Sequence, residues 1–103
     1  MSTASIPFKV VLADSLKDPL QAQAYLDVAL EEYEQEGDLP FFLQALRNVA
    51  EAQGGLSQLA EKTALNRQNL YKALAAEGNP KIQTVAAMLR GMGLRLSVQA
   101  IRS

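Results

Sequence analysis

The sequence predicts a mainly α protein of five helices followed by a short C-terminal strand. Apolar residues recur at helical spacing, most clearly in FFLQALRNVA, residues 41–50. Asp-Pro, Gly-Asp, Gly-Gly and Asn-Pro pairs divide the chain into short segments, as helix starts and stops do. In the tail LRLSVQAI, residues 94–101, apolar residues alternate with polar ones, which is the period of a strand.

Length and composition indicate one domain with a modest core, because the chain has 103 residues, of which 49% are hydrophobic. It has neither cysteine nor histidine, which excludes disulfides, thiolate sites and the commonest general base and metal ligand. No segment reaches the ~20 apolar residues of a membrane span, and no basic region marks a signal peptide. We therefore expect a cytoplasmic protein without membrane contact, enzymatic activity, cofactor or metal.

Charge is distributed unevenly along the chain. Residues 1–53 carry three Lys/Arg and nine Asp/Glu, whereas residues 54–103 carry seven and two. This asymmetry favours two different partners, with two solvated faces as the alternative. Residues 16–103 are expected to form one domain. The predicted regions are an N-terminal arm (1–15), an acidic helical half (16–53), a basic helix-turn-helix half (54–93) and a strand (94–101).

Two helices are predicted in the acidic half. Asp18 is the expected N-cap of the first, with Pro19 in its first turn, and Gly37 ends it. Asp38 caps the second helix, which Gly54 and its neighbour end. The apolar positions expected to face the core are Leu20, Ala24, Leu26, Val28 and Leu30 in the first helix and Phe41, Phe42, Ala45, Leu46, Val49 and Ala50 in the second.

The basic half begins with two short helices separated by a break. Ser57 is the expected N-cap of the first. The segment TALN, residues 63–66, interrupts the run, and Leu65 lies in the turn as an apolar plug. Asn66 is suited to cap the second helix by accepting from backbone N–H groups two or three residues later.

The second of these helices is rich in long hydrogen-bonding side chains. Leu70 and Leu74 lie four residues apart and face the core, which leaves the polar residues exposed. A helix of this kind can enter the major groove, where Arg pairs with guanine and Asn or Gln with adenine. The candidate base contacts are Arg67, Gln68, Asn69, Tyr71 and Lys72. The candidate phosphate contacts, at helix starts, are Ser57, Gln58, Asn66, Lys81, Gln83 and Thr84. A helical hairpin with a solvated polar face is the alternative.

The last helix is expected to start at Asn79-Pro80 and to be broken by Gly91 and Gly93. Its core-facing residues would be Ile82, Val85, Met88, Leu89 and Met92. The tail strand needs a partner. One candidate is the run IPFKVVLA, residues 6–13, which fits either a strand or an extended arm. The other is the same strand of a second subunit, which would make Leu94, Leu96 and Val98 part of a homodimer.

Residues 56–89 resemble the Cro/lambda-repressor type of helix-turn-helix. More narrowly, YLDVALEE and the run from FFLQALRNVA to GLRLSV are similar to the addiction-module antidote proteins, the HigA-like antitoxins of type II toxin–antitoxin systems. The resemblance covers about residues 16–98, and LYKALAAEGNPKIQTV is its most distinctive part. Ala64 departs from the family pattern, which usually has glycine at this left-handed turn position. Alanine costs about 1 kcal/mol there, so we expect a slightly reshaped turn.

The resemblance implies a Cro/lambda-repressor-like domain with two activities. Such proteins neutralise a cognate toxin, typically a small basic RelE-type ribonuclease, and repress their own operon as dimers on a palindromic operator in double-stranded DNA. The acidic half fits a basic partner, so the candidate toxin-facing residues are Asp27, Glu31, Glu32, Glu34 and Glu36. The alternatives are a stand-alone phage-type repressor without a toxin, a small carboxylate hydrolase, and an interaction module whose polar helix contacts protein.

Overall fold

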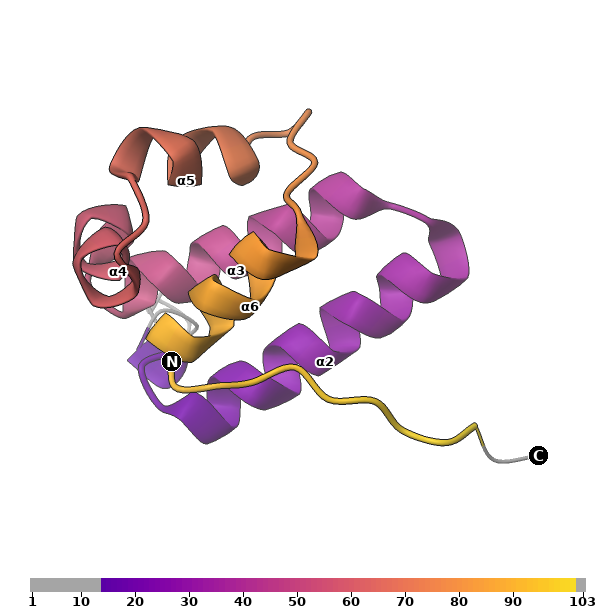
Figure 1. Ribbon diagram of the computed structural model, residues 1–103. Helices are drawn as coiled ribbons and strands as arrows, with labels where there is room; N and C mark the ends of the chain where they lie inside the picture. Colours follow the sequence, from indigo (N-terminus) through magenta and orange to yellow (C-terminus); the bar gives the residue numbers. More distant parts are fainter. Residues whose placement is uncertain (1–13, 102–103) are drawn as a thin grey trace, which may run out of the picture.

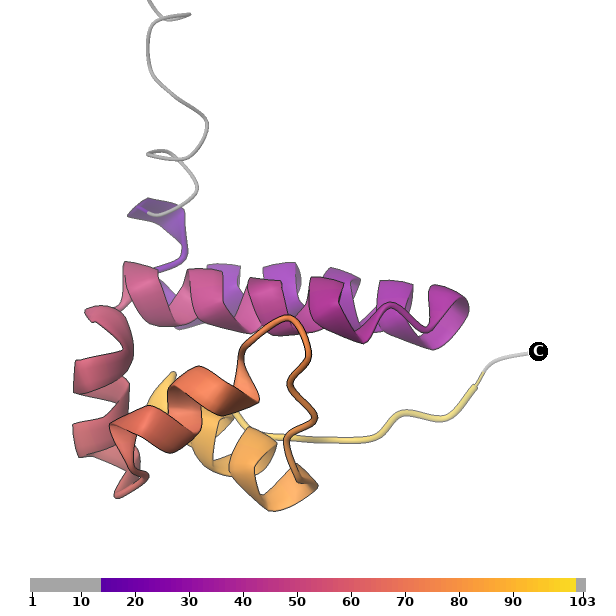
Figure 2. The same ribbon diagram turned by 90° about the horizontal axis from the view of Figure 1, so that it is seen from above.

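The computed structural model describes residues 14–101 and shows five helices, with no strand in that range. The helices are α2 (Pro19–Glu36), α3 (Leu39–Ala52), α4 (Gly55–Thr63), α5 (Arg67–Ala73) and α6 (Ile82–Gly91). α2 and α3 lie side by side as an antiparallel hairpin, and α4, α5 and α6 gather on one side of it (Figure 1, Figure 2). The prediction of a mainly α chain with five helices is confirmed. None of these helices is long and apolar enough to cross a membrane.

Local hydrogen bonds set the bounds of the α2–α3 hairpin. The Asp18 carboxylate accepts from the Leu20 N–H at 3.1 Å and opens α2. Gly37 takes the left-handed conformation (φ +73°), and its N–H donates to the Tyr33 carbonyl at 2.7 Å. Asp38 then accepts from the Phe41 N–H at 3.1 Å and opens α3. The caps and the stop that the sequence predicts here are confirmed.

Two helix starts differ from the prediction. α4 begins at Gly55, directly after Gly54 (φ +116°), so Ser57 lies inside its first turn and does not cap it. Both glycines have positive φ, which lets the chain reverse within two residues and start the next helix early. α6 begins at Ile82 with Lys81 as its cap residue, later than predicted. Pro80 disfavours the helical conformation of the residue before it, and residues 79–81 are non-helical.

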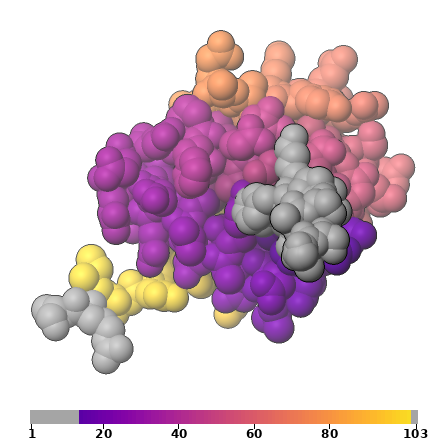
Figure 3. All heavy atoms as spheres, turned by 180° about the vertical axis from the view of Figure 1, so that it is seen from behind, coloured from indigo at the N-terminus to yellow at the C-terminus, as the bar shows by residue number. Residues whose placement is uncertain are grey.

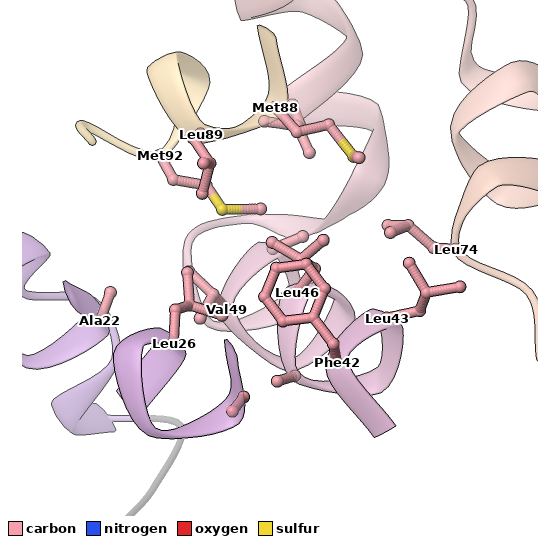
Figure 4. Close-up of a cluster of buried hydrophobic side chains, with 14 of the residues drawn as sticks. Ala22, Leu26, Phe42, Leu43, Leu46, Val49, Leu74, Met88, Leu89 and Met92 are labelled. Atoms are coloured by element: carbon pink, nitrogen blue, oxygen red, sulfur yellow. The ribbon is translucent and has the colours of Figure 1, made fainter. Parts of the chain in front are cut away.

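One apolar core joins all five helices, and α3 supplies the largest share of it. Figure 4 shows Met88 and Leu89 of α6, and Met92 directly after it, pointing towards Leu46 and Val49 of α3. These five side chains are between 0 and 8% exposed. Burying a side chain of this size contributes about 1.5–3 kcal/mol, so these side chains are a main source of stability.

Several residues that we predicted to face the core are exposed: Leu20, Ala24, Val28, Phe41 and Ile82. The three in α2 recur every four residues on the side opposite Ala22 and Ala29, which are the ones buried. Phe41 lies about 100° from Phe42 around α3, outside the face whose side chains are buried.

Side-chain hydrogen bonds add links between distant parts of the chain. The Asn48 amide donates to the Tyr25 hydroxyl at 2.8 Å and joins α3 to α2. The Gln53 amide donates to the carbonyls of Leu16, at 3.3 Å, and Met92, at 3.4 Å. The end of α3 therefore holds both the segment before α2 and the end of α6.

The tail, residues 94–101, does not form the predicted strand. A strand needs a second strand to pair its backbone groups, and residues 14–101 contain none. The proposed partner at 6–13, and the rest of the arm up to residue 13, lie outside the described residues. The end of the tail projects beyond the helices (Figure 3), and Val98 and Ile101 are 98% and 96% exposed.

Candidate nucleic-acid interface

Three residues, Ala64 to Asn66, connect α4 to α5 in a tight turn. Ala64 has φ +60° and ψ +18°, and within residues 14–101 no other non-glycine residue has a positive φ. The Thr63 hydroxyl donates to the Leu59 carbonyl at 2.7 Å and accepts from the Leu65 N–H at 3.3 Å. Leu65 is half-buried, as expected of a plug. The alanine therefore adopts the left-handed conformation that a glycine favours, and the reshaping expected at this residue is not observed.

A side-chain cap and two buried leucines fix α5. The Asn66 carbonyl oxygen Oδ1 accepts from the N–H groups of Gln68, at 2.7 Å, and Asn69, at 3.4 Å. Leu70 and Leu74 are 0 and 1% exposed. The predicted cap and core face are confirmed. Because Asn66 already satisfies two N–H groups of α5, those groups are not free to bind a phosphate.

The five candidate base contacts are all exposed on this helix. At about 100° per residue, Gln68 and Lys72 point most directly away from the buried leucines. Arg67 and Tyr71, four residues apart, lie on one flank, and Asn69 lies on the other. α5 thus presents donors and acceptors across its whole outer surface.

Arg67 and Tyr71 contact each other. The guanidinium carbon lies 5.4 Å from the centre of the Tyr71 ring. The guanidinium Nη2 also donates to the Tyr71 hydroxyl at 3.4 Å. A cation at this distance from an aromatic ring is attracted to it. This pair was not predicted from the sequence, although the four-residue spacing was a signal for it.

The candidate phosphate contacts lie at the starts of three helices. Ser57 and Gln58 are exposed in the first turn of α4, whose N-terminus no side chain caps. Lys81 and Gln83 are exposed at the start of α6, and Thr84 is half-buried. Within the described part of the chain, no carboxylate lies within ion-pair distance of the basic residues of α4 to α6. Their positive charges remain available to an anionic partner.

The candidate toxin-facing carboxylates are all exposed on α2. They do not form one cluster: Asp27, Glu31 and Glu34 lie on one side of the helix, whereas Glu32 and Glu36 lie towards the other. None of them is in an ion pair within residues 14–101, and no cluster of carboxylates there could hold a metal ion.

A groove of about 920 Å³ lies between the hairpin and the end of the chain. α2 and α3 form one wall, and α6, Gly93 and the tail residues 94–97 and 99 form the other. Leu94 and Leu96 line it, together with Ile82, which is 73% exposed. Leu94 and Leu96 were predicted to lie in a strand, and the groove was not predicted, because the distance between segments far apart in the chain is not visible in the sequence.

Comparison with known proteins gives the family. The family described as "Probable addiction module antidote protein" matches residues 7–100. A protein of Haemophilus influenzae (strain ATCC 51907 / DSM 11121 / KW20 / Rd), described as "Uncharacterized protein", is 34% identical over 91 residues, which are 88% of this chain and 89% of the relative. No solved structure matches the chain. With a match over nearly its whole length, the chain belongs to the addiction-module antidote family.

Proposed function

We propose that the protein is an antitoxin that neutralises a cognate toxin and represses its own operon by binding DNA. Family membership supports the antitoxin role. The DNA-binding role rests on α5, a short helix anchored by two buried leucines whose other surface is polar and exposed. Both roles consist of binding and need no catalysis. Repression of an operon would take place in the cytoplasm.

In this proposal α4 and α5 act as a helix-turn-helix of the Cro/lambda-repressor type within a single domain, residues 16–103. α5 lies in the major groove, where Gln68 and Lys72 face the base edges and Arg67, Tyr71 and Asn69 reach bases on either flank. The cap at Asn66 and the buried Leu70 and Leu74 hold the helix rigid, which lowers the entropy cost of binding.

Phosphates would be held by the helix starts around α5. The first turn of α4, with Ser57 and Gln58, has backbone N–H groups that no side chain caps. Lys81, Gln83 and Thr84 bring a positive charge and hydrogen-bond donors from α6. At Asn66 the side-chain NH₂ group remains free to donate, because only Oδ1 is used in the cap.

A homodimer is expected because α5 has only seven residues and reads few base pairs. The tails supply unpaired strand-like segments for it. When two tails pair antiparallel about Ser97, Leu96 lies opposite Val98 of the partner subunit, so apolar side chains share one face. Two half-sites then require a palindromic operator.

The dimer assignment is tested by sedimentation. Removal of residues 94–103 should give a monomer. Leu96→Ala with Val98→Ala should weaken the dimer, whereas Arg95→Ala with Gln99→Ala, on the opposite face of the paired strand, should leave it intact. An unchanged dimer after truncation would contradict the assignment.

The proposed toxin is a small basic ribonuclease of the RelE type, bound by the acidic α2. Asp27, Glu31 and Glu34 share one side of this helix and form the stronger candidate surface, whereas Glu32 and Glu36, towards the other side, form the weaker one. A stand-alone phage-type repressor is the alternative function, which the antidote family match makes the weaker of the two.

The toxin role is tested with the protein encoded by the neighbouring reading frame. Co-expression should rescue growth, and the pair should co-purify. Asp27→Asn with Glu31→Gln should weaken the complex several-fold, because each exposed ion pair contributes about 0.2–1 kcal/mol. Glu32→Gln with Glu36→Gln removes the same charge from the other side and serves as the control. Failure of the wild-type protein to bind or rescue would contradict the antitoxin role.

A further inference from the structure

We propose that Tyr71 is a positioning residue that holds the Arg67 guanidinium ready to read a guanine. This inference rests on the proposed DNA-binding function and deepens it. Tyr71 thereby acts on the base through Arg67, and the preference of α5 for guanine depends on two side chains.

Two contacts join Arg67 and Tyr71 in the free protein. The Arg67 guanidinium carbon lies 5.4 Å from the Tyr71 ring centre, and Nη2 lies 3.4 Å from the Tyr71 hydroxyl. Tyr71 is itself half exposed, at 51%, so both partners lie on the surface that faces solvent. Within residues 14–101 no carboxylate draws Arg67 into an ion pair.

The backbone beneath the pair is fixed. Asn66 caps the helix directly before Arg67, and Leu70 is completely buried directly before Tyr71. The four-residue spacing puts the two side chains on one flank of α5. The ring therefore projects from an anchored backbone position and offers a surface on which the long Arg67 side chain rests.

The geometry leaves the arginine competent for base contacts. A guanidinium has five N–H donors in one plane, and the hydroxyl of Tyr71 uses one. The remaining donors can form the two parallel bonds to O6 and N7 of guanine. Ordering the side chain in advance removes part of the entropy cost that a free arginine would incur on binding.

The first test uses the free protein and needs no DNA. A stacked ring shifts the NMR signals of the Arg67 side-chain protons. These shifts should be present in the wild type and in Tyr71→Phe, which keeps the ring, and absent in Tyr71→Ala. Unchanged Arg67 shifts in Tyr71→Ala would overturn the proposal. Leu70 and Leu74 signals report whether each variant keeps its fold.

The second test measures binding to the upstream duplex and to copies in which one guanine at a time is replaced by adenine. Tyr71→Ala should reduce the preference for the guanine read by Arg67 by roughly two- to five-fold, the range of an exposed cation–ring contact. Tyr71→Phe should keep most of it. In an Arg67→Ala background, Tyr71→Ala should change that preference no further.

Two adverse outcomes are distinguishable. If the wild type discriminates between duplexes but the effects of Tyr71→Ala and Arg67→Ala add independently, Tyr71 does not act through Arg67 and this inference falls alone. If the wild type binds every duplex equally, the proposed DNA-binding function fails and the inference with it. Gln68→Ala is the control, since it should alter binding without coupling to Tyr71.

Discussion

The α2–α3 hairpin and the α4–α5 pair are both two helices joined by a short turn, yet different features hold them. The hairpin has helices of 18 and 14 residues, and the glycine in its turn takes a left-handed conformation without strain. The second pair has helices of nine and seven residues, and an alanine occupies the left-handed position of its turn. The hairpin helices supply nine buried residues and the helices of the second pair three, so the hairpin carries the larger share of the core, and α5 has a largely polar, exposed surface.

The largest expected loss of stability comes from truncating a core leucine, and the hydrogen exchange that follows should differ between the two regions. Leu46→Ala and Leu70→Ala each remove a completely buried side chain and should destabilise the protein by about 2–5 kcal/mol. Leu46 belongs to the central helix, so its loss should raise hydrogen exchange throughout. Leu70→Ala should raise it first in α5. An equal rise in hydrogen exchange in all helices of both variants would contradict this difference between the hairpin and the α4–α5 pair.

The next largest loss of stability is expected from a substitution at Gly91, where α6 crosses α4. A Cβ on Gly91 would lie 2.6 Å from Leu59 Cδ1 and 2.7 Å from Thr63 Cγ2. Gly91→Ala should therefore force the Leu59 and Thr63 side chains, or the helices that carry them, to shift and should cost about 1–3 kcal/mol, measured by urea unfolding. An unchanged midpoint would show that the crossing has room that the structure does not indicate.

The caps give a matched pair of smaller effects. Asn66→Ala and Asp38→Ala each remove an oxygen that accepts from the first turn of a helix, and each should cost about 1 kcal/mol. Only Asn66→Ala should also weaken DNA binding, because the cap orients α5. Anisotropy titrations of both variants at a temperature where both are folded provide the check.

The two turns should respond oppositely to exchange of glycine and alanine. Gly37→Ala puts a Cβ at φ +73° and should destabilise by about 1 kcal/mol. Ala64→Gly relieves the same strain at φ +60°, and after the entropy cost of glycine should stabilise by about 0.5 kcal/mol. A loss of stability in Ala64→Gly would mean that the alanine is not strained there.

Local features of this fold were predictable from the sequence. The caps at Asp18, Asp38 and Asn66 and the stop at Gly37 depend on residues two to four positions away, and the structure confirms all four. The prediction that Ser57 caps α4 was wrong, because Gly54 and Gly55 allow this helix to start earlier.

Features that depend on distant contacts were not predictable. The exposure of Val28 and Phe41 follows from which side of each helix meets its neighbour. The tail has the alternation of a strand but, within the described residues, no strand to pair with. At the candidate site, sequence spacing placed the polar residues on one helix, but the stacking of Arg67 on Tyr71 required coordinates.

The most direct test of the account is fluorescence anisotropy with duplex DNA from upstream of the gene. A scrambled duplex is compared with it, and salt is varied from low to physiological. We expect tight binding to the native duplex, weak binding to the scrambled one, a smaller difference between the two in Gln68→Ala, and no change in Gln35→Ala, an exposed glutamine on α2. Equal and weak binding of the wild type to both duplexes would contradict the claim that α5 reads DNA.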